Sequence, residues 1–486
     1  MTQASNQHHD VSIESTIQDN KSSVPHTSFS PYQQKFHIQP QSGDLKGPSG
    51  IVFNKGDYEI TYQWLAEQAV ALYQMTSENL VDFKTANEVM THKHFQKDIR
   101  VSREHAFVFN KTIYYMYTRY SKTEADTYLN QQVISKKDED GQLGVKEHVF
   151  IPHAPKGYQN LEHPSTLIRD DKLYVVIGAQ REDLTGCVLL YQAEHPEAKW
   201  TFLGEIKTEL KTMESTWQYP ELFQLSGKDI LLFLPKMHQQ SEMTNVNQSG
   251  YIIGHLDFDT LQFQHEPFQL LDHGFDFDAP QTFVDEVGRR VMIASMNHSD
   301  VVYPTDHQGS ANCLTLPRTL MLEEGKLKQK PYMNLRKLRG EKETALGYAN
   351  KFVKQLHPYD GTQYELVVDI LENEAQAFEF QLRATRDEYV VVRYQSKTKE
   401  VILDRFDSGK LPVGCASTKT LAVLPSDLYQ LRIFVDTTSI EVFCNEGERV
   451  LTSRIFPTQD GNKIRVSTDS GQVYLNIAKY DLSSVD

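Results

Sequence analysis

The sequence predicts an all-β protein of two domains, and two observations carry that prediction. From Phe36 onward the chain consists of short apolar or alternating runs, such as HAFVFN, DKLYVVIGAQ and DILLFLP, which are typical of β-strands. Turn-prone pieces such as FNKT, IRDDK and LSGKD separate these runs, at spacings that suit antiparallel hairpins and leave no room for regular crossover helices. A doubly wound parallel sheet is therefore disfavoured, and a β-propeller or a stack of sheets is expected over roughly the first 300 residues.

A second β-rich region begins at about residue 350. Runs such as YELVVDILE, FEFQLRA and SIEVFCN alternate apolar and polar residues, which predicts a half-buried antiparallel sandwich. We expect a loosely ordered N-terminal arm over 1–30, a propeller over 31–330, a charged, helix-tolerant linker over 331–348 and a sandwich over 349–486.

Composition excludes several classes of protein. Of the 486 residues, 39% are hydrophobic and 24% are charged, which is the mix of a globular chain. The formal net charge of -15 argues against nucleic acid and against an anionic membrane as partners. The N-terminus is polar and lacks the apolar core of a secretory signal, and the chain contains no membrane span. Four cysteines lie far apart without a CxxC pair, so we expect a cytoplasmic protein without a cofactor or a resident metal.

Several motifs carry a family resemblance. KFHIQP followed by GDLKGPSGIVF resembles the family's opening segment, and WQYPELFQL, GFDFDAPQTF and YPTDHQGSANCLTLPRTL follow in the family's order. FVDTTSIEVFCNEGERVLTSRIFP resembles its C-terminal signature. The family is glycoside hydrolase family 32, in its sucrose-6-phosphate hydrolase (invertase, β-fructofuranosidase) branch. The resemblance implies a five-bladed β-propeller followed by a C-terminal β-sandwich, and hydrolysis of fructosyl saccharides with retention of configuration.

The resemblance also implies where catalytic residues belong, and there this chain departs from the family. The family's NDPNG matches KGPSG, which places Gly47 at the nucleophilic Asp. WECPD matches WQYPE, which places Gln218 at the general acid, and RDP matches EHP, which places His163 at the stabilising Asp. Retaining hydrolysis needs one carboxylate to attack and one carboxylic acid to donate a proton. We therefore expect none of these three positions to be catalytically competent.

Four further positions match the family's sugar pocket: Trp64, Ser102, Glu162 and Asp278. Ser102 belongs to SREH, where the family has SGSA, so larger residues follow it in place of small ones. Glu162 stands where the family has Arg, and Asp278 stands where it has Tyr. Framework residues are retained while pocket residues change.

Two alternatives stay open for the acidic residues of this region. Asp44 or Glu221 could replace the missing carboxylates, although the alternation of a strand turns a residue three positions away to the opposite face. Acquired polar residues could also bind a divalent metal or a cationic ligand, although relaxed drift explains them as well. These residues are Glu104, His105, Glu162, His163 and Asp278.

The leading hypothesis is a catalytically deficient homologue with a carbohydrate-binding or regulatory role, whose partner is a fructose-containing sugar or sugar phosphate. The alternative is an active glycosidase that hydrolyses sucrose 6-phosphate or sucrose with retention through relocated carboxylates. A third interpretation is a gene product without a molecular task. The sequence assigns no protein partner.

Overall fold

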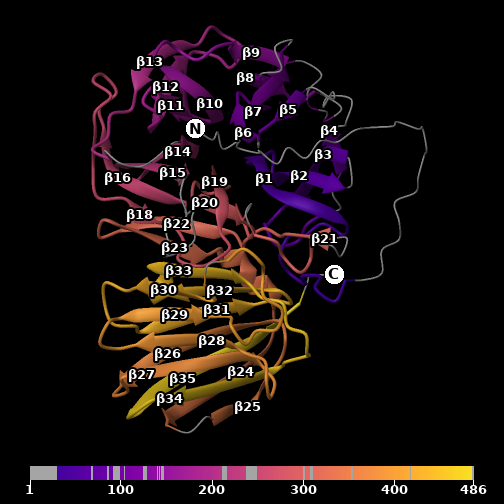
Figure 1. Cartoon of the computed structure of the whole chain (residues 1–486), viewed down its shortest axis with the longest axis vertical. Coiled ribbons are helices and arrows are strands. Elements are labelled where there is room, and N and C mark those ends of the chain that lie inside the picture. Colours follow the sequence, from indigo (N-terminus) through magenta and orange to yellow (C-terminus); the bar gives the residue numbers. More distant parts are fainter. Residues whose placement is uncertain are drawn as a thin grey trace, which may run out of the picture.

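The computed structural model describes residues 30–483 apart from 67–68, 85–86, 91–98, 103, 124–127, 139–140, 142, 144–146, 211–215, 237–248, 299–300, 307–309, 352–353 and 416. The described residues form seven β-sheets, of which five make a propeller and two make a sandwich (Figure 1). The arm expected over 1–30 lies outside the described residues except for Ser30. No helix of the described part is long and apolar enough to cross a membrane.

The five blades follow one another in sequence around the propeller axis, and neighbouring blades meet through their innermost strands β1, β6, β10, β14 and β19. Blade I comprises β1 (Gly43–Asn54), β2 (Asp57–Ala66), β3 (Ala69–Ser77), β4 (Asn87–Met90) and β21 (Ser310–Ala311). Blade II comprises β5 (Ile99–Val101), β6 (His105–Phe109), β7 (Thr112–Lys122), β8 (Tyr128–Lys136) and β9 (Glu147–Ile151). Blade III comprises β10 (Tyr158–Arg169), β11 (Lys172–Arg181), β12 (Gly186–Ala193) and β13 (Thr201–Glu205).

Blade IV comprises β14 (Thr216–Leu225), β15 (Lys228–Lys236), β16 (Gly250–Leu256), β17 (Phe263–His265) and β18 (Gln269–Leu270). Blade V comprises β19 (Asp278–Val284), β20 (Arg290–Ser295), β22 (Arg318–Glu323) and β23 (Lys326–Pro331). In the chain, the short strand β21 lies between β20 and β22, which both belong to blade V. It pairs in parallel with β1 and so links the last blade to the first. This contact closes the ring of blades.

Two-residue turns join the first hairpins of the blades. Asn110 and Lys111 connect β6 to β7, and Asp170 and Asp171 connect β10 to β11; all four have positive φ. Two consecutive residues of positive φ are the pattern of a type I′ turn, whose twist matches that of the flanking strands. The turns predicted from FNKT and IRDDK are therefore confirmed.

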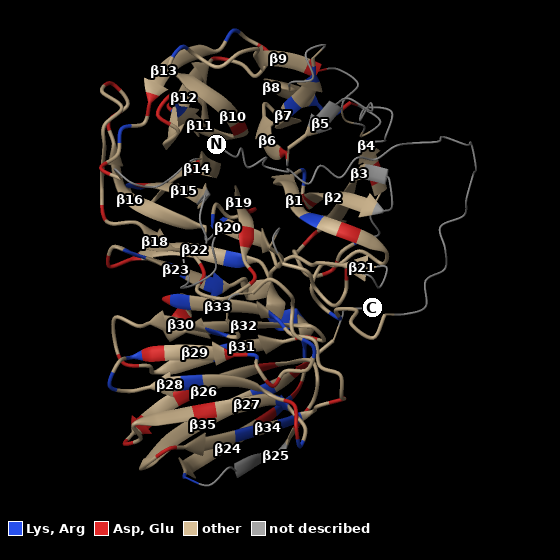
Figure 2. Cartoon of the chain, viewed as in Figure 1, with Lys and Arg blue, Asp and Glu red and all other residues tan. Residues whose placement is uncertain are grey.

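The sandwich packs two six-stranded antiparallel sheets face to face around an apolar core. One sheet contains β24 (Arg339–Asn350), β35 (Gln472–Leu482), β26 (Tyr364–Asn373), β31 (Gln430–Val435), β32 (Ser439–Cys444) and β33 (Arg449–Arg454). The other contains β25 (Lys354–Asp360), β34 (Lys463–Thr468), β27 (Ala377–Ala384), β28 (Val390–Gln395), β29 (Glu400–Asp404) and β30 (Lys419–Val423). Figure 2 shows acidic and basic positions interspersed along these strands.

The segment expected as a linker, 331–348, instead carries regular structure. A 3-10 helix, η1 (Met333–Leu338), leads directly into β24, which pairs along its length with β35. The high charge of this segment suggested a connection, but β24 is an edge strand, and an exposed edge tolerates charged side chains. A second short 3-10 helix, η2 (Asn445–Gly447), joins β32 to β33.

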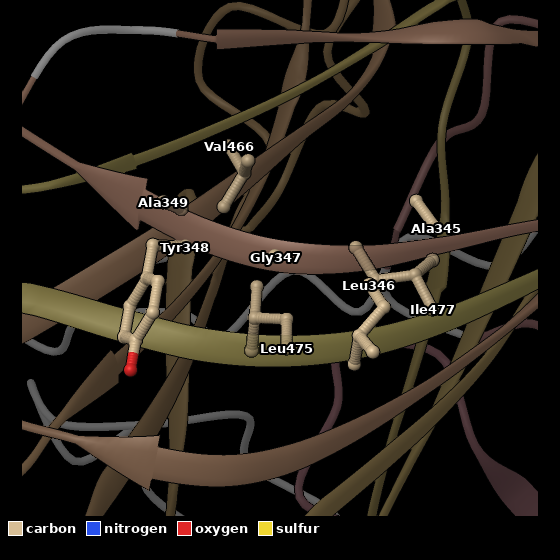
Figure 3. A pocket seen from close by; sticks show the side chains of 8 residues that line it. All are labelled: Ala345, Leu346, Gly347, Tyr348, Ala349, Val466, Leu475 and Ile477. Carbon is tan, nitrogen blue, oxygen red and sulfur yellow. The ribbon is translucent and has the colours of Figure 1, made fainter.

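The edge strand β24 borders a small apolar cavity of the sandwich. Figure 3 shows Leu346 and Tyr348 beside Leu475 and Ile477 of the neighbouring strand β35. The ring of Tyr348 stacks on Tyr474 with 4.5 Å between centroids. The cavity measures about 40 Å³, which is close to the volume of one water molecule and too small for a saccharide.

Propeller and sandwich share an apolar cluster and a buried network of charges. Phe434 and Phe443 of the sandwich belong to one cluster with Ile293 and Leu314 of the propeller. The Arg318 guanidinium donates to Asp272 at 2.9 Å and to Glu441 at 2.6 Å, with all three side chains fully buried. These contacts connect blade V to strand β32.

His37 extends the same network. Its Nδ1 lies 2.8 Å from Asp436 and its Nε2 lies 3.1 Å from Glu441. Burial by itself lowers the pKa of His37, but the hydrogen bonds to the two carboxylates outweigh burial and raise this pKa to about 9. The imidazole is therefore an imidazolium at neutral pH and acts as a cation between two carboxylates of the sandwich.

Candidate functional site

The innermost strands of four blades share one irregularity near the propeller axis. Strands β1, β10, β14 and β19 each contain a register shift, at Leu45/Pro48, Glu162/Ser165, Gln218/Glu221 and Asp278/Gln281. In each case a residue of positive φ directly precedes a proline, and these residues are Gly47, His163, Tyr219 and Ala279. A β-bulge re-aims the side chains of its strand and is common beside functional sites.

The two residues before each of these prolines are called the bulge ring below. The bulge ring consists of Lys46, Gly47, Glu162, His163, Gln218, Tyr219, Asp278 and Ala279. It contains every position that the sequence analysis assigned to the reaction.

Residues that follow the prolines tie the five inner strands together. Gln281 of β19 accepts a hydrogen bond from the Gly50 amide of β1 and donates one to the Glu104 carbonyl that precedes β6. The remaining contacts join β6 to β10, β10 to β14 and β14 to β19; they are His105 with Thr166, Ser165 with Pro220, and Thr282 with Glu221. We call these contacts between inner strands the belt; they hold the bulge ring in a fixed geometry.

Gly47 differs in its backbone from the residue that precedes the proline of blade III. Its φ is +111°, whereas His163, the corresponding residue of blade III, has φ +56°. Asp and Asn tolerate the left-handed region near +57°, but L side chains rarely adopt a φ of +111°. This position therefore supplies no nucleophilic oxygen, and its backbone favours glycine.

Gln218 and Glu162 meet across blades III and IV. The Gln218 amide nitrogen donates to a Glu162 carboxylate oxygen at 3.3 Å. The Tyr120 hydroxyl also hydrogen-bonds Glu162, and burial together with this carboxylate raises the pKa of Tyr120. The His163 ring lies against Tyr219 with 3.9 Å between centroids and is 9% exposed. The structure thus brings three of the predicted site residues, Glu162, His163 and Gln218, into one group.

Blade II contributes a buried acid, Glu104, beside strand β2 of blade I. The Gln63 amide of β2 donates to both Glu104 carboxylate oxygens at 3.4 Å and to the Ser102 carbonyl at 3.1 Å. Glu104 is 1% exposed, and the Ser102 hydroxyl accepts a hydrogen bond from the Thr118 amide at 2.9 Å. Gln63 and Tyr120 were missed in the sequence analysis, although Gln63 directly precedes Trp64, which was chosen. Arg103 lies outside the described residues.

Trp64 braces the beginning of β1. Its indole nitrogen donates to the Ser42 carbonyl at 2.6 Å, and its ring meets Tyr73 at 5.3 Å between centroids. These two contacts of Trp64 are made with residues outside the bulge ring. Its predicted role in binding the sugar stays a prediction.

Asp278 lies on the other side of the ring, in a cavity between blades V and I. This cavity of about 290 Å³ is also lined by Asp44 and Lys46 of β1 and by Asn297 and Asn312 of blade V. Asp44 forms an ion pair with Lys46 and accepts a hydrogen bond from Asn312. Asp44 is therefore engaged in this cavity and not at the Gly47 position.

Glu221 is committed to the belt between blades. It is buried and accepts hydrogen bonds from the amide and the hydroxyl of Thr282, with His105 Nδ1 at 4.0 Å. Burial raises the pKa of Glu221 to about 7. Burial, and then the Arg290 charge, lower the pKa of His105 to about 4. Both residues are thus engaged in contacts between blades.

A metal centre has no support in the residues that the structure describes. They contain no group of three or more His, Cys, Asp or Glu side chains placed to hold an ion. The acidic run DHGFDFD is structural: Asp272 binds Arg318, and Asp276 accepts hydrogen bonds from Arg405 and Tyr303.

Comparison with known proteins identifies the family. The model of the glycosyl hydrolases family 32 N-terminal domain matches residues 37–331, and the model of the family 32 C-terminal domain matches residues 334–483. The chain belongs to glycoside hydrolase family 32.

Among relatives of this family 32 protein, the sucrose-6-phosphate hydrolase of Staphylococcus xylosus is 41% identical over 93% of each chain. The sucrose-6-phosphate hydrolase of Bacillus subtilis is 28% identical over 94% of this chain and 96% of the relative. Among solved structures, sucrose-6-phosphate hydrolase from Lactobacillus gasseri superimposes with a TM-score of 0.84 at 24% identity, covering 94% of both chains. A family 32 β-fructofuranosidase of Bombyx mori gives 0.79 at 25% identity, over 93% of this chain and 94% of that one.

Family 32 membership confirms the five-bladed propeller with its C-terminal sandwich. The assignment of Gly47, His163 and Gln218 to the catalytic positions stays a prediction from the motifs. All three residues belong to the bulge ring: Gly47 and His163 directly precede the prolines of blades I and III, and Gln218 lies two residues before the proline of blade IV.

Proposed function

We propose that this family 32 protein recognises β-fructofuranosyl saccharides of the sucrose 6-phosphate type but lacks the family's double-displacement hydrolysis. One observation carries the proposal: the ring positions matched to nucleophile and proton donor hold Gly47 and Gln218. The saccharide class is supported by the relatives, which are sucrose-6-phosphate hydrolases with coverage of nearly the whole chain.

The chemistry of these side chains is the reason for the deficiency. Glycine has no atom that can attack the anomeric carbon, so no fructosyl-enzyme ester forms at that position. The Gln218 amide resembles a carboxylic acid in shape but has no ionisable proton near neutral pH to give to the departing oxygen. Loss of one member of a catalytic unit typically lowers the rate by ~10⁴-fold, and further losses add little because the pathway has already failed.

Binding of a sugar does not need these carboxylates. The group around Glu162 still offers carboxylate, amide, hydroxyl and imidazole side chains from three neighbouring strands, and Tyr219 and Tyr120 add aromatic rings. Polar groups that converge beside aromatic surfaces are the usual composition of a saccharide site.

A second candidate is hydrolysis of sucrose 6-phosphate or sucrose through relocated carboxylates. The 41% identity to the Staphylococcus xylosus enzyme favours it, and the relatives support this candidate more directly than they support a deficient protein. Its carboxylates would be Glu162, which belongs to the bulge ring and accepts a hydrogen bond from Gln218, and Glu104, which accepts a hydrogen bond from Gln63 of blade I. Retaining hydrolysis requires the two carboxyl groups to stand about 5.5 Å apart with the sugar between them.

The deciding experiment measures release of fructose from sucrose 6-phosphate and from sucrose. We expect the unaltered protein to stay at background, and a Gly47→Asp, His163→Asp, Gln218→Glu triple variant to exceed it by orders of magnitude if the ring can again accept substrate. Glu162→Gln is the matched variant for the second candidate. Turnover by the unaltered protein that disappears in Glu162→Gln would replace the first proposal by the second.

Sugar recognition is tested separately by calorimetry. We expect heat of binding with millimolar sucrose, sucrose 6-phosphate or fructose, and a loss of this heat in Glu162→Gln. Glu286→Gln, an exposed change outside the ring, is the control and should bind like the unaltered protein. No heat with any of these sugars would remove the binding half of the proposal.

A further inference from the structure

A pocket lies between blades III and IV, and it is called the inter-blade pocket below. The hairpin of β10 and β11 contributes Arg169, Asp170 and Tyr174 to its wall, and segment 255–264 of blade IV contributes the rest. Its volume of about 530 Å³ is that of a small-molecule site. Arg169 follows His163 by six residues along β10, which places the inter-blade pocket roughly 20 Å from the bulge ring. The two sites are therefore separate.

One buried carboxylate joins the two walls of the inter-blade pocket. Asp229, whose side chain is buried, accepts a hydrogen bond from Arg169 Nη1 at 3.1 Å and lies 3.5 Å from His255 Nδ1. The Arg169 guanidinium lies over the Phe258 ring at 4.7 Å, and Tyr174 meets the same ring edge-on at 5.0 Å between centroids. Polar and aromatic groups of the wall are therefore held in place before a ligand arrives, which lowers the entropic cost of binding.

Tyr174 combines a buried ring with a hydroxyl group that has no partner. The residue is 7% exposed, and its hydroxyl makes no hydrogen bond with the residues that the structure describes. Burial, and then the Asp170 carboxylate, raise the pKa of Tyr174, so the hydroxyl keeps its proton and can donate. Because Tyr174 lines the inter-blade pocket, a ligand there can accept this hydrogen bond.

Further hydrogen-bonding atoms of the wall are open. The Asp257 Oδ1 atom accepts hydrogen bonds from the amides of Asp259 and Thr260, which leaves its Oδ2 atom without a partner among the described residues. Arg169 uses Nη1 for Asp229, and its Nη2 makes no hydrogen bond within the same part of the chain. A carboxylate accepts and a guanidinium donates, so the wall offers both functions to one ligand.

The charges of the wall do not select an ion. They are the guanidinium of Arg169, the imidazole of His255 and the carboxylates of Asp170 and Asp257, and the other lining side chains are uncharged. Arg169 is already paired with Asp229, so an anion such as a phosphate group meets no free cation. Asp170 and Asp257 are exposed, and solvent screens their attraction for a cation. A neutral ligand fits this wall best.

We propose that the inter-blade pocket binds a neutral saccharide of pyranose rings, of about disaccharide size. A pyranose chair presents a flat apolar face of C–H groups, which suits the ring of Phe258. Its hydroxyl groups accept hydrogen bonds from Tyr174 and Arg169 and donate to Asp257 Oδ2. The inference goes beyond the proposed function, because the ligand needs no fructosyl unit and the inter-blade pocket lies apart from the bulge ring.

The test is calorimetry on the full chain near neutral pH, with maltose, cellobiose and lactose as probes. These three disaccharides are neutral, consist of pyranose rings and contain no fructosyl unit. We expect at least one of them to bind in the millimolar range. Sorbitol is the comparison ligand, because it has similar hydroxyl groups but no ring to lie against Phe258, and it should bind at least about threefold more weakly.

Conservative variants locate the binding. Tyr174→Phe removes only the hydroxyl group and should weaken binding by about threefold to tenfold. Asp257→Asn keeps an oxygen for the Asp259 and Thr260 amides but loses the charged acceptor, with an effect of similar size. Tyr191→Phe is the matched control, because the Tyr191 hydroxyl also has no partner among the described residues but lies outside the inter-blade pocket. It should leave the affinity unchanged.

Glu162→Gln separates this inference from the proposed function. The change lies in the bulge ring, so it should leave binding of the disaccharide probes unchanged. It should remove binding of sucrose 6-phosphate, whose phosphate group the carboxylates of the inter-blade pocket disfavour. A loss of sucrose 6-phosphate binding alone therefore concerns only the proposed function.

Each contrary result overturns the inference. No heat with any of the three disaccharides at high millimolar concentration would show that the inter-blade pocket takes no such ligand. Unchanged affinity in both Tyr174→Phe and Asp257→Asn, or an equal loss in Tyr191→Phe or Glu162→Gln, would place the probe elsewhere. Equal affinity for sorbitol would show that the sugar ring is not recognised. A preference of about tenfold or more for glucosamine hydrochloride over glucose would show that the carboxylates select a cation.

Discussion

Buried charges occupy two regions of this protein, and the two regions treat them differently. At the junction of propeller and sandwich every charge that we have described meets an opposite charge, as Arg318 does with Asp272 and Glu441. At the propeller axis Glu221 and His105 are instead shifted towards their neutral forms, because burial raises the pKa of Glu221 to about 7 and lowers that of His105 to about 4. Ion pairs therefore stabilise the junction, whereas the hydrogen bonds of Glu221 and His105 at the axis persist when these two groups are neutral.

The comparison of junction and axis bears on the proposed loss of hydrolysis. Carboxylates at the junction meet basic partners, whereas the positions of the bulge ring that the motifs match to the family's catalytic residues carry Gly47, His163 and Gln218. Loss of a carboxylate from the ring leaves no buried cation without a partner, so it costs the fold little. Loss of Asp272 or Glu441 from the junction would leave the buried Arg318 with one carboxylate in place of two.

The largest effect is expected at the junction, for Arg318→Met. This change leaves Asp272 buried without its cation and leaves Glu441 with His37 alone, which should lower the free energy of unfolding by about 3–5 kcal/mol. Denaturant unfolding of the full chain measures it. Lys326→Met is the control, because its partly exposed pair with Glu448 should be worth less than about 1 kcal/mol. Equal costs for the two variants would remove the distinction between a charged junction and the rest.

The pH dependence of His37 is the next effect. Because its pKa is about 9 in the fold and 6.5 when free, its contribution is complete below pH 6.5 and is lost as the pH rises through 9. The shift corresponds to about 3 kcal/mol. Unfolding measured from about pH 6 to about pH 10 should show this loss in the unaltered protein and a flatter profile in His37→Gln. A similar flattening in His255→Gln, whose side chain is 65% exposed, would contradict the assignment to His37.

Glu221 tests the axis with a change of similar or smaller size. Its pKa is raised from 4.5 to about 7, so the folded state holds this proton more tightly and stability falls as the pH rises from 4.5 through 7. The loss amounts to at most about 3 kcal/mol. Glu221→Gln is neutral at every pH and can still accept the Thr282 hydrogen bonds, so it should be the more stable protein at about pH 8. A Glu221→Gln protein that is strongly destabilised at that pH would show that the axis needs the charge.

The smallest effect concerns the backbone of the bulge ring. Gly47→Ala places a side chain at φ +111°, which should cost about 1–2 kcal/mol in the free energy of unfolding. Gly347→Ala in β24 is a matched control, since its added methyl group meets nothing within 4 Å and its φ is not in the left-handed region. A neutral Gly47→Ala would mean that the backbone at this position can accept a side chain, and with it the family's Asp.

Much of the architecture was predictable from local patterns. The apolar runs and turn pieces predicted strands, and residues such as Asn110 and Asp170 do form the turns expected of them. The segment 331–348 was the main exception, because the charges of β24 are those of a connection as much as those of an edge strand. The limits of the four predicted segments otherwise stay a prediction.

The site was predictable only in part. The order of the motifs pointed to Gly47, His163 and Gln218, and all three lie within the two residues that precede the prolines of the bulged strands. Gln63 and Tyr120 were not found, because they belong to strands β2 and β7 and reach Glu104 and Glu162 only across blade boundaries. Asp44 was judged by strand alternation, which a bulge interrupts.

The amino-acid sequence alone determined the family, the number of domains and the side chains at the positions that match the family's catalytic motifs, because these depend on residue type and on order along the chain. Only the tertiary structure decided which acidic side chains line the same cavity. Asp44, Asp278 and Asp306 lie far apart in sequence and line one cavity since closure of the propeller brings blade V beside blade I. Proximity across that closure is a property of the ring of blades, and no local pattern encodes it.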